Sequence, residues 1–256
     1  MGIVNCTPDS FSDGGQFRNF QEAIDYGLKL FEEGADILDI GGESTRPGSR
    51  SVTVEKEMQR VLPVLEGLAK KIDIPLSIDT QKASVAKMAL NAGATIINDV
   101  SSGNDPSMFA LAAQEKATLC LMHKKGTPET MQKNPFYENP LQEIYSFLQE
   151  RSSQALKKGV ERSKIWIDPG IGFGKRLEDN VTLIRNLSSF QKLGFPILIG
   201  TSRKNFIGEI LDLPVSERLE GTLASLAVAT REGASIVRVH DVKAVKRFLT
   251  VLNAFS

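Results

Sequence analysis

The stretch EEGADILDI (Glu32–Ile40) leads from a predicted helix into a predicted strand, and its pattern returns in NAGATIIND (Asn91–Asp99) and REGASIVRV (Arg231–Val239). In each stretch a glycine follows the helical segment, and a glycine just past the last turn commonly ends a helix. The apolar run that comes next lacks polar alternation, as in strands that are buried on both faces. Three such units in one chain favour a parallel α/β fold over an α+β fold.

Short apolar runs of the same kind occur along the whole chain. We expect strands at residues 3–5, 37–40, 76–79, 95–98, 118–122, 165–168, 197–200 and 236–239, with amphipathic helices at 20–33, 54–71 and 85–91. Eight strands in 256 residues match the size of one (β/α)8 TIM barrel, whose active site gathers at the carboxyl ends of the strands. We therefore predict an α/β chain with a single barrel domain over residues 1–256 and long loops after strands 1 and 2.

The composition excludes several classes of protein. Lys+Arg and Asp+Glu both number 31, which argues against nucleic acid as the main partner. No apolar run is long enough to span a membrane, and the first residues lack the pattern of a signal peptide. The two cysteines, Cys6 and Cys120, fit a reduced cytoplasmic protein better than a disulfide, although the sequence leaves a disulfide open. The first strand begins almost at residue 1, which leaves open a longer natural chain or a larger protein that contains this one.

Polar side chains end the third, fourth and sixth strands of the predicted barrel, at Asp79, Asn98 and Asp168. Two carboxylates and an amide at adjoining strand ends can hold a flat heterocycle with several N–H donors, because buried polar groups need such partners. The alternative is that each aspartate caps the helix that follows it. Three such residues together favour a ligand.

The later strands also end in candidate binding residues. DPGIGFGK (Asp168–Lys175) has three glycines, which allow close approach of the backbone, and it matches no nucleotide-binding motif. A tight turn is the alternative interpretation. GTSRK (Gly200–Lys204) and RVHD (Arg238–Asp241) follow strands 7 and 8, where barrels often bind phosphate. Arginine is a bidentate donor to phosphoryl oxygens, so these strings predict an anion site, whereas we expect a structural role for His123.

Two long loops carry single reactive side chains among small residues. TPDSFSDGG (Thr7–Gly15) contains Phe11 and Asp13, and ESTRPG (Glu43–Gly48) contains Arg46. Long loops in a compact domain are often active-site lids, although solvated loops also have this composition.

Five ordered strings, MGIVNCTPDSFSDGG, GGESTRPG, DPGIGFGK, SRK and RVHD, resemble the dihydropteroate synthase family of folate-pathway, pterin-binding enzymes over essentially the whole chain. The resemblance implies a transferase that condenses 6-hydroxymethyl-7,8-dihydropterin diphosphate with p-aminobenzoate, giving 7,8-dihydropteroate and pyrophosphate. It also implies Mg²⁺, a homodimer and sulfonamides as inhibitors. The segments NDVSSGNDPSM and KKGTP depart from the family pattern, which puts the packing of those loops in doubt.

The resemblance gives each candidate residue a role. The pterin is expected to bind to Asp79, Asn98, Asp168, Phe173 and Lys204. The diphosphate is expected at Asn5, Arg238 and His240, with Asn5 also the metal ligand. The p-aminobenzoate pocket is expected to comprise Phe11, Thr45, Arg46, Pro47, Ser202 and Arg203. The catalytic residues are expected to be Asp13, Arg46, Lys204 and Asp79.

Two rival functions stay open. A pterin-binding methyltransferase barrel would share the Asp/Asn/Asp pocket and pass a methyl group from methyltetrahydrofolate to a corrinoid, but it needs no diphosphate site, so SRK and RVHD argue against it. A non-catalytic barrel would bind a pterin or a protein partner, and the reactive side chains of the two loops argue against that.

Overall fold

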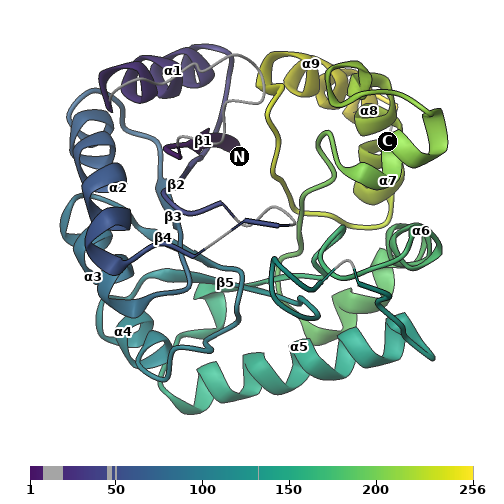
Figure 1. Cartoon of the computed structure of the whole chain (residues 1–256), viewed down its shortest axis with the longest axis horizontal. Coiled ribbons are helices and arrows are strands. Elements are labelled where there is room, and N and C mark those ends of the chain that lie inside the picture. Colours follow the sequence, from purple (N-terminus) through teal and green to yellow (C-terminus); the bar gives the residue numbers. More distant parts are fainter. Residues whose placement is uncertain (8–19, 45–47, 50, 132, 256) are drawn as a thin grey trace.

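The computed structural model describes residues 1–7, 20–44, 48–49, 51–131 and 133–255, and these form a ring of strands enclosed by helices (Figure 1). The strands are β1 (Gly2–Asn5), β2 (Leu38–Gly41), β3 (Leu76–Asp79), β4 (Ile96–Asp99), β5 (Thr118–Met122), β6 (Ile165–Asp168), β7 (Leu198–Ile199) and β8 (Ile236–Val237). The α-helices are α1 (Phe20–Glu32), α2 (Val54–Ala69), α3 (Ala83–Asn91), α4 (Met108–Gln114), α5 (Pro140–Lys157), α6 (Leu177–Arg185), α7 (Asn205–Leu211), α8 (Leu219–Arg231) and α9 (Val242–Asn253). Short 3₁₀ helices lie at η1 (Arg162–Lys164), η2 (Leu187–Leu193) and η3 (Val215–Glu217).

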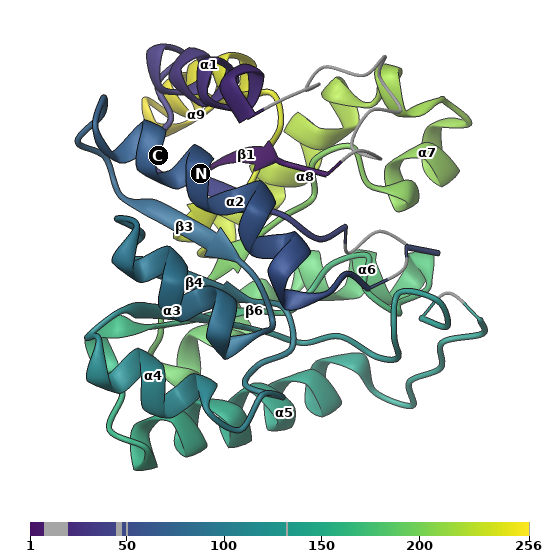
Figure 2. The same cartoon turned by 60° about the vertical axis from the view of Figure 1, so that its left-hand side comes forward.

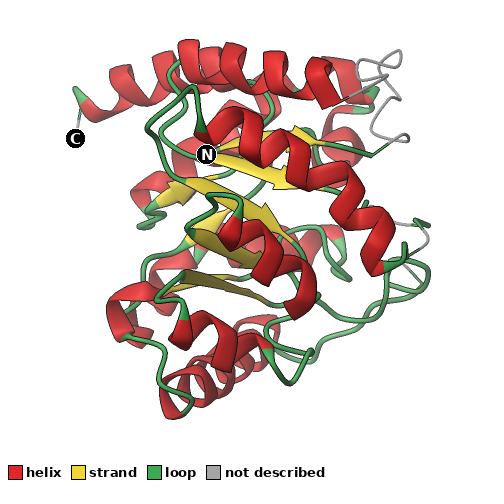
Figure 3. Ribbon diagram, turned by 90° about the vertical axis from the view of Figure 1, so that its left-hand side faces the viewer, coloured by secondary structure: helices red, strands yellow, loops and turns green. Residues whose placement is uncertain are grey.

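The strand pairing confirms the predicted (β/α)8 barrel. Strands β1 to β6 pair in parallel in chain order, and β7 pairs in parallel with β8. Two isolated bridges, Gly2 with Val239 and Ile167 with Ile197, join the two sheets at both edges and close the ring. Seen from the side, the helices lie outside the strands (Figures 2 and 3).

The predicted elements are present with bounds that differ by at most two residues. The largest difference among the strands is at β8, whose pairing passes from β7 to β1 at Val239, so that its regular ladder is short. The predicted helix ends are confirmed in the three repeated units, where Gly34, Gly93 and Gly233 have φ angles of 95°, 108° and 96°. The long loops are confirmed as well, because β1 is followed by α1 only at Phe20 and β2 by α2 only at Val54.

The interior of the barrel is built in layers. Ile37, Trp166 and Ile236 pack inside the ring around the buried side chains of Met1, Cys120 and Leu198. Side chains alternate along a strand, so the residues two positions further on also point inward, one layer nearer to the carboxyl ends. Those residues are Asp39, Asp168 and Arg238. A layer of charge therefore lies directly on the apolar layer.

The larger apolar core lies between the strands and the helices. Ile40, Ile78, Ile97, Leu119 and Ile167 are fully buried there. Within the part of the chain that the structure describes, no helix combines the length and the apolarity that crossing a membrane would require.

Candidate active site

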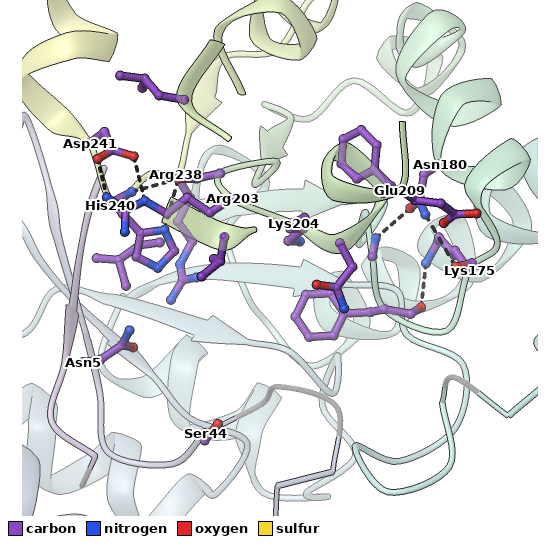
Figure 4. A pocket seen from close by; sticks show the side chains of 18 of the residues that line it. Asn5, Ser44, Lys175, Asn180, Arg203, Lys204, Glu209, Arg238, His240 and Asp241 are labelled. Carbon is purple, nitrogen blue, oxygen red and sulfur yellow. Dashed lines mark hydrogen bonds and ion pairs between the residues drawn. The ribbon is translucent and has the colours of Figure 1, made fainter. Parts of the chain in front are cut away.

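A pocket of about 1560 Å³ lies at the carboxyl ends of the strands. Its lining includes eight of the predicted site residues: Asn5, Asp79, Phe173, Ser202, Arg203, Lys204, Arg238 and His240. The close view shows Arg203, Arg238, His240 and Asp241 on one side and Lys175 with Asn180 on the other, with Lys204 between them (Figure 4). The volume exceeds the roughly 300–1,000 Å³ typical of a single ligand, so two small molecules can be held side by side.

The floor of this pocket is a network of buried polar side chains. Arg238 donates from Nε to Asp39 Oδ2 at 2.6 Å and from Nη2 to Asp79 Oδ2 at 2.8 Å. Asn98 donates from Nδ2 to the same Asp39 oxygen at 3.0 Å. Asp39 is fully buried, and its other oxygen has no hydrogen-bond partner among the described residues. One arginine, directly after β8, therefore joins β2 to the end of β3.

The charges in the network act on one another. Burial raises the pKa of Asp79, and the nearby Asp39 carboxylate adds to the rise, although Arg238 opposes it. Burial also acts against the charge of Arg238, yet the two carboxylates raise the pKa of its guanidinium above the ordinary value. Arg238 is thus a fixed cation, and it compensates two acids at once.

The alternative role of the strand-end aspartates as helix caps does not describe their contacts in the structure. Asp168 Oδ1 accepts a hydrogen bond from the backbone N–H of Gly170 at 2.7 Å, inside the turn that follows β6. Helix α6 begins later, where Asp179 accepts from the backbone N–H of Arg176 at 2.9 Å. Asp79 is bonded to Arg238 instead. Neither acid therefore caps a helix. Asp79 lines the pocket, whereas Asp168 is buried and is not among the described residues that line it.

The glycines of the Asp168–Lys175 loop allow the close approach that the sequence predicts. Gly170 has a φ of 69°, and a Cβ there would lie 1.8 Å from the carbonyl oxygen of His123. The loop consequently packs directly against the segment that follows β5. The ammonium group of Lys204 lies 4.6 Å from the centre of the Phe173 ring and donates to the carbonyl of Ile171. Phe173 and Lys204 thus form one wall of the pocket.

Asp168 and Lys204 interact electrostatically. Burial raises the pKa of Asp168, while Lys204 opposes the rise. Burial lowers the pKa of Lys204 to about 8, and Asp168 opposes that fall. A buried carboxyl group and the cationic donor of the pocket wall suit a heterocycle that carries both kinds of hydrogen-bonding group.

The ends of β7 and β8 form the other side of the pocket. The backbone N–H of His240 donates to Ser202 Oγ at 3.1 Å, and Ser202 Oγ lies 3.0 Å from His240 Nδ1. Arg203 forms a bidentate pair with Asp241, with distances of 3.0 Å from Nε to Oδ2 and 2.6 Å from Nη2 to Oδ1. These contacts clamp the two loops together. Ser202 and Arg203, predicted for the p-aminobenzoate pocket, contact the predicted anion site.

Asn5 ends β1 and faces the ends of β2 and β3. A Cβ on Gly41 would lie 3.8 Å from Asn5 Oδ1 and 3.6 Å from Asp79 Cβ. Among the described residues there is no group of three or more His, Cys, Asp and Glu side chains that could hold a metal ion. A site with one amide oxygen fits Mg²⁺ only when a ligand phosphate and water supply the remaining oxygens.

Five predicted site residues, Phe11, Asp13, Thr45, Arg46 and Pro47, lie outside the described residues, so their roles stay predictions. Sequence reasoning missed Asp39, the centre of the buried network, and Asp241, the partner of Arg203. The sequence did contain a signal for Asp39. It is the single acid in the apolar run at residues 37–40, and a buried carboxylate needs polar partners, which the apolar layer between strands and helices does not offer.

One departure from the family pattern has a local explanation. Asp99 accepts hydrogen bonds from the backbone N–H groups of Ser101 and Gly103, at 2.8 and 2.5 Å, and so shapes the turn after β4. Arg151 of α5 donates to the carbonyls of Ser102 and Gly103 at 2.6 and 2.7 Å. The segment NDVSSGNDPSM is therefore held both by its own turn and by α5.

Comparison with known proteins decides the family. The model of the family described as "Pterin binding enzyme" matches residues 1–240. Dihydropteroate synthase of Haemophilus influenzae is 44% identical over 254 residues, covering 99% of this chain and 92% of that protein. This chain belongs to the dihydropteroate synthase family. It is therefore a transferase, and the resemblance seen in the sequence is confirmed.

Solved structures of the family agree in fold. The Yersinia pestis dihydropteroate synthase with a sulfonamide drug complex superposes with a TM-score of 0.96 at 41% identity, covering 100% of this chain and 93% of that chain. The Xanthomonas albilineans enzyme in complex with 7,8-dihydropteroate has a TM-score of 0.89 at 41% identity, covering 100% and 92%. Solved structures of this family thus hold a sulfonamide drug complex in one case and 7,8-dihydropteroate in the other.

Proposed function

We propose that this chain condenses 6-hydroxymethyl-7,8-dihydropterin diphosphate with p-aminobenzoate to give 7,8-dihydropteroate and pyrophosphate. The arylamine nitrogen forms a bond to the CH₂ group of the pterin, the C–O bond to the diphosphate breaks, and the amine loses a proton. The observation that carries the proposal is one pocket that joins two halves, an acidic half with Asp79, the Phe173–Lys204 wall and the adjoining buried Asp168, and a half with Asn5, Arg238 and His240. These halves match the heterocycle and the leaving group of one substrate.

The acidic half would bind the pterin. Asp168 would accept hydrogen bonds from the N–H groups of the pterin, and the Asn98 amide would donate to or accept from it. Phe173 would pack against the ring beside Lys204. Positive charge develops on the ring as the diphosphate leaves, and an ionised Asp168 would stabilise it. Fixed charges that complement the charge of the transition state are the largest single contribution in many enzymes. Asp79 would bind the pterin and help to hold Arg238 in place.

The other half would bind the diphosphate. Asn5, Arg238 and His240 line the same pocket and would donate to its oxygens, and Ser202 orients His240 through the contacts described above. Mg²⁺, held by Asn5 and by the diphosphate itself, would neutralise the charge of the leaving group when bound. Arg238 belongs to both halves, because its guanidinium also holds Asp39 and Asp79.

The second substrate would bind beside the first. Phe11, Thr45, Arg46 and Pro47 remain the proposed p-aminobenzoate pocket, with Arg203 at its edge and sulfonamides as competitors. Asp13 and Arg46 remain proposed catalytic residues near the reacting centre. Glu43 and Ser44 line the pocket and bring the chain to Thr45.

Pyrophosphate release in the presence of both substrates and Mg²⁺ tests the proposal. We expect release that depends on each substrate and stops when EDTA removes the metal. Methyl transfer from methyltetrahydrofolate to a corrinoid, without pyrophosphate release, would establish the rival methyltransferase. Pterin binding with neither reaction would establish a non-catalytic barrel.

We further propose a cytoplasmic homodimer. Cys6 and Cys120 are free thiols, as suits a reducing compartment. Large apolar side chains are exposed along the last helices and the chain between them, at Ile210, Leu211, Leu213, Val215, Val228 and Val251. Light scattering during size-exclusion chromatography should give about twice the 28.0 kDa mass of the chain.

A further inference from the structure

We propose that Lys175 is a positioning residue of the pterin site, whose buried ammonium group fixes the Asp168–Lys175 loop on the end of β5 and places a positive charge at the opposite end of this loop from Asp168. The proposal rests on the proposed function, because it concerns the half of the pocket assigned to the pterin. Lys175 is the last residue of DPGIGFGK, and no other feature of the sequence distinguishes it from a surface lysine.

Lys175 is almost completely buried, with 3% of its surface exposed, which is rare for a lysine. Its Nζ lies 3.0 Å from His123 Nδ1, and it donates to the carbonyls of His123 at 3.4 Å and Phe173 at 3.1 Å. The contact with the Phe173 carbonyl holds the residue whose ring forms the pocket wall. One side chain therefore connects this wall to the segment that follows β5.

His123 is suited to accept from this lysine. Burial, together with the charges of Lys175 and Lys125, lowers the pKa of His123 to about 2, so the imidazole is neutral. Its ring packs edge-on against Phe147, with the ring centres 4.9 Å apart, which fixes its orientation. A neutral ring whose Nδ1 faces an ammonium group accepts there. The structural role predicted for His123 is consistent with these contacts.

Two further supports of the loop are uncharged. The hydroxyl of Tyr137 donates to the carbonyl of Gly174 at 2.9 Å, and the backbone N–H of Gly172 donates to Asn180 Oδ1 at 2.7 Å. These bonds hold the loop whatever the charge of Lys175. A variant that keeps the size of the lysine and removes its charge should therefore fold. It should lose the electrostatic effect on Asp168 and the hydrogen bond to the carbonyl of Phe173.

The charged groups around the pair come from several elements. Lys175, Lys204 and Arg238 all act to lower the pKa of Asp168, which burial raises. Burial lowers the pKa of Lys175 to about 7, and the surrounding charges are those of Asp168, Lys204, Asp179 and Lys125. Lys175 is thus charged in the acidic range, where Asp168 would otherwise take up a proton. Removing that charge should make Asp168 bind a proton at higher pH.

Steady-state kinetics of Lys175→Met and Lys175→Arg test the inference, with Lys158→Met as the matched control at an exposed lysine beyond α5. For Lys175→Met we expect the KM of the dihydropterin diphosphate to rise about tenfold, the size of one lost charge-assisted contact, with the KM of p-aminobenzoate nearly unchanged. The acid limb of the pH profile of kcat/KM for the pterin should move about one unit toward neutral pH. Lys175→Arg should keep the acid limb in place.

Each result bears on the inference. An equal loss at every pH, or an equal rise of both KM values, would show that Lys175 only fills space and would overturn it. If Lys175→Met does not fold, as judged by its melting temperature, His123→Leu and His123→Asn decide. His123→Leu should raise the KM for the pterin substrate, whereas His123→Asn, which retains a hydrogen-bond acceptor, should leave that KM close to the wild-type value. No effect of either would overturn the inference. A wild-type chain that releases no pyrophosphate would instead refute the proposed function.

Discussion

The two arginines at the ends of the last strands have similar exposure but very different partners. The side chains of Arg238 and Arg203 are 22% and 28% exposed. Arg238 pairs with Asp39 and Asp79, which are 0% and 8% exposed, whereas Arg203 pairs with Asp241, which is 21% exposed. Water can replace the arginine at Asp241 but not at Asp39. The stability lost when either arginine is removed should therefore depend on how deeply its carboxylate partner is buried.

The replacement Arg238→Ala should have the largest effect. It leaves two buried carboxylates without their cation, and breaking a buried pair typically lowers the free energy of unfolding by about 3–5 kcal/mol. Pterin and pyrophosphate binding should both weaken, because the network belongs to both halves of the pocket. Denaturant unfolding measures the first effect and calorimetry the second. The double variant Arg238→Ala/Asp39→Asn should recover part of the stability, and a loss no larger than that of Arg203→Ala would refute the comparison.

Asp168→Asn tests the third buried acid, which has a lysine rather than an arginine opposite it. A hydrogen bond to a charged group contributes roughly 1.5–3 kcal/mol, so pterin affinity should fall more than tenfold. Calorimetry with a pterin that lacks the diphosphate measures this directly, and pyrophosphate binding serves as the control. Unchanged pterin affinity would remove Asp168 from the pocket.

Lys175 extends the comparison to a cation that is buried without a directly bonded carboxylate. Its pKa is about 7 in the folded chain and 10.5 ordinarily, so between these values the unfolded chain binds the proton and the folded chain does not. Stability should therefore rise with pH across this window, by at most about 1.4 kcal/mol per pH unit. The difference in unfolding free energy between wild type and Lys175→Met should show this rise. A difference that stays constant between pH 7 and 9 would contradict it, and Lys158→Met should parallel the wild type.

The smallest effect is expected for Arg203→Ala. Its carboxylate partner is open to water, so the loss of unfolding free energy should stay below about 1 kcal/mol. Activity should respond more than stability, through a higher KM for p-aminobenzoate, because Arg203 lines the pocket. Asp241→Asn, which removes the same ion pair from the other side, should match it in stability. A loss of unfolding free energy comparable to that of Arg238→Ala would mean that the burial of the carboxylate partner does not distinguish the two ion pairs.

The sequence by itself determined the barrel and the position of the site. Glycines that end helices, and apolar runs without polar alternation, depend on residues adjacent in the chain, so the units around Gly34, Gly93 and Gly233 could be read directly. The closure of a parallel barrel then brings all strand ends to one face. For this reason Asp79, Asn98, Asp168 and Arg238 could be placed near one another before any coordinate was known.

Only the tertiary structure decided which of these groups bond to one another. Arg238 and Asp39 are 199 residues apart, and Lys175 and His123 are 52 apart, and both contacts depend on the radius and layering of the closed barrel. Local sequence carries no information on such distances, whereas burial makes their energies large. Arg238, predicted from RVHD as an anion ligand, is therefore also the bridge between two buried acids, and His123, expected to be structural, receives the lysine that holds the pterin loop.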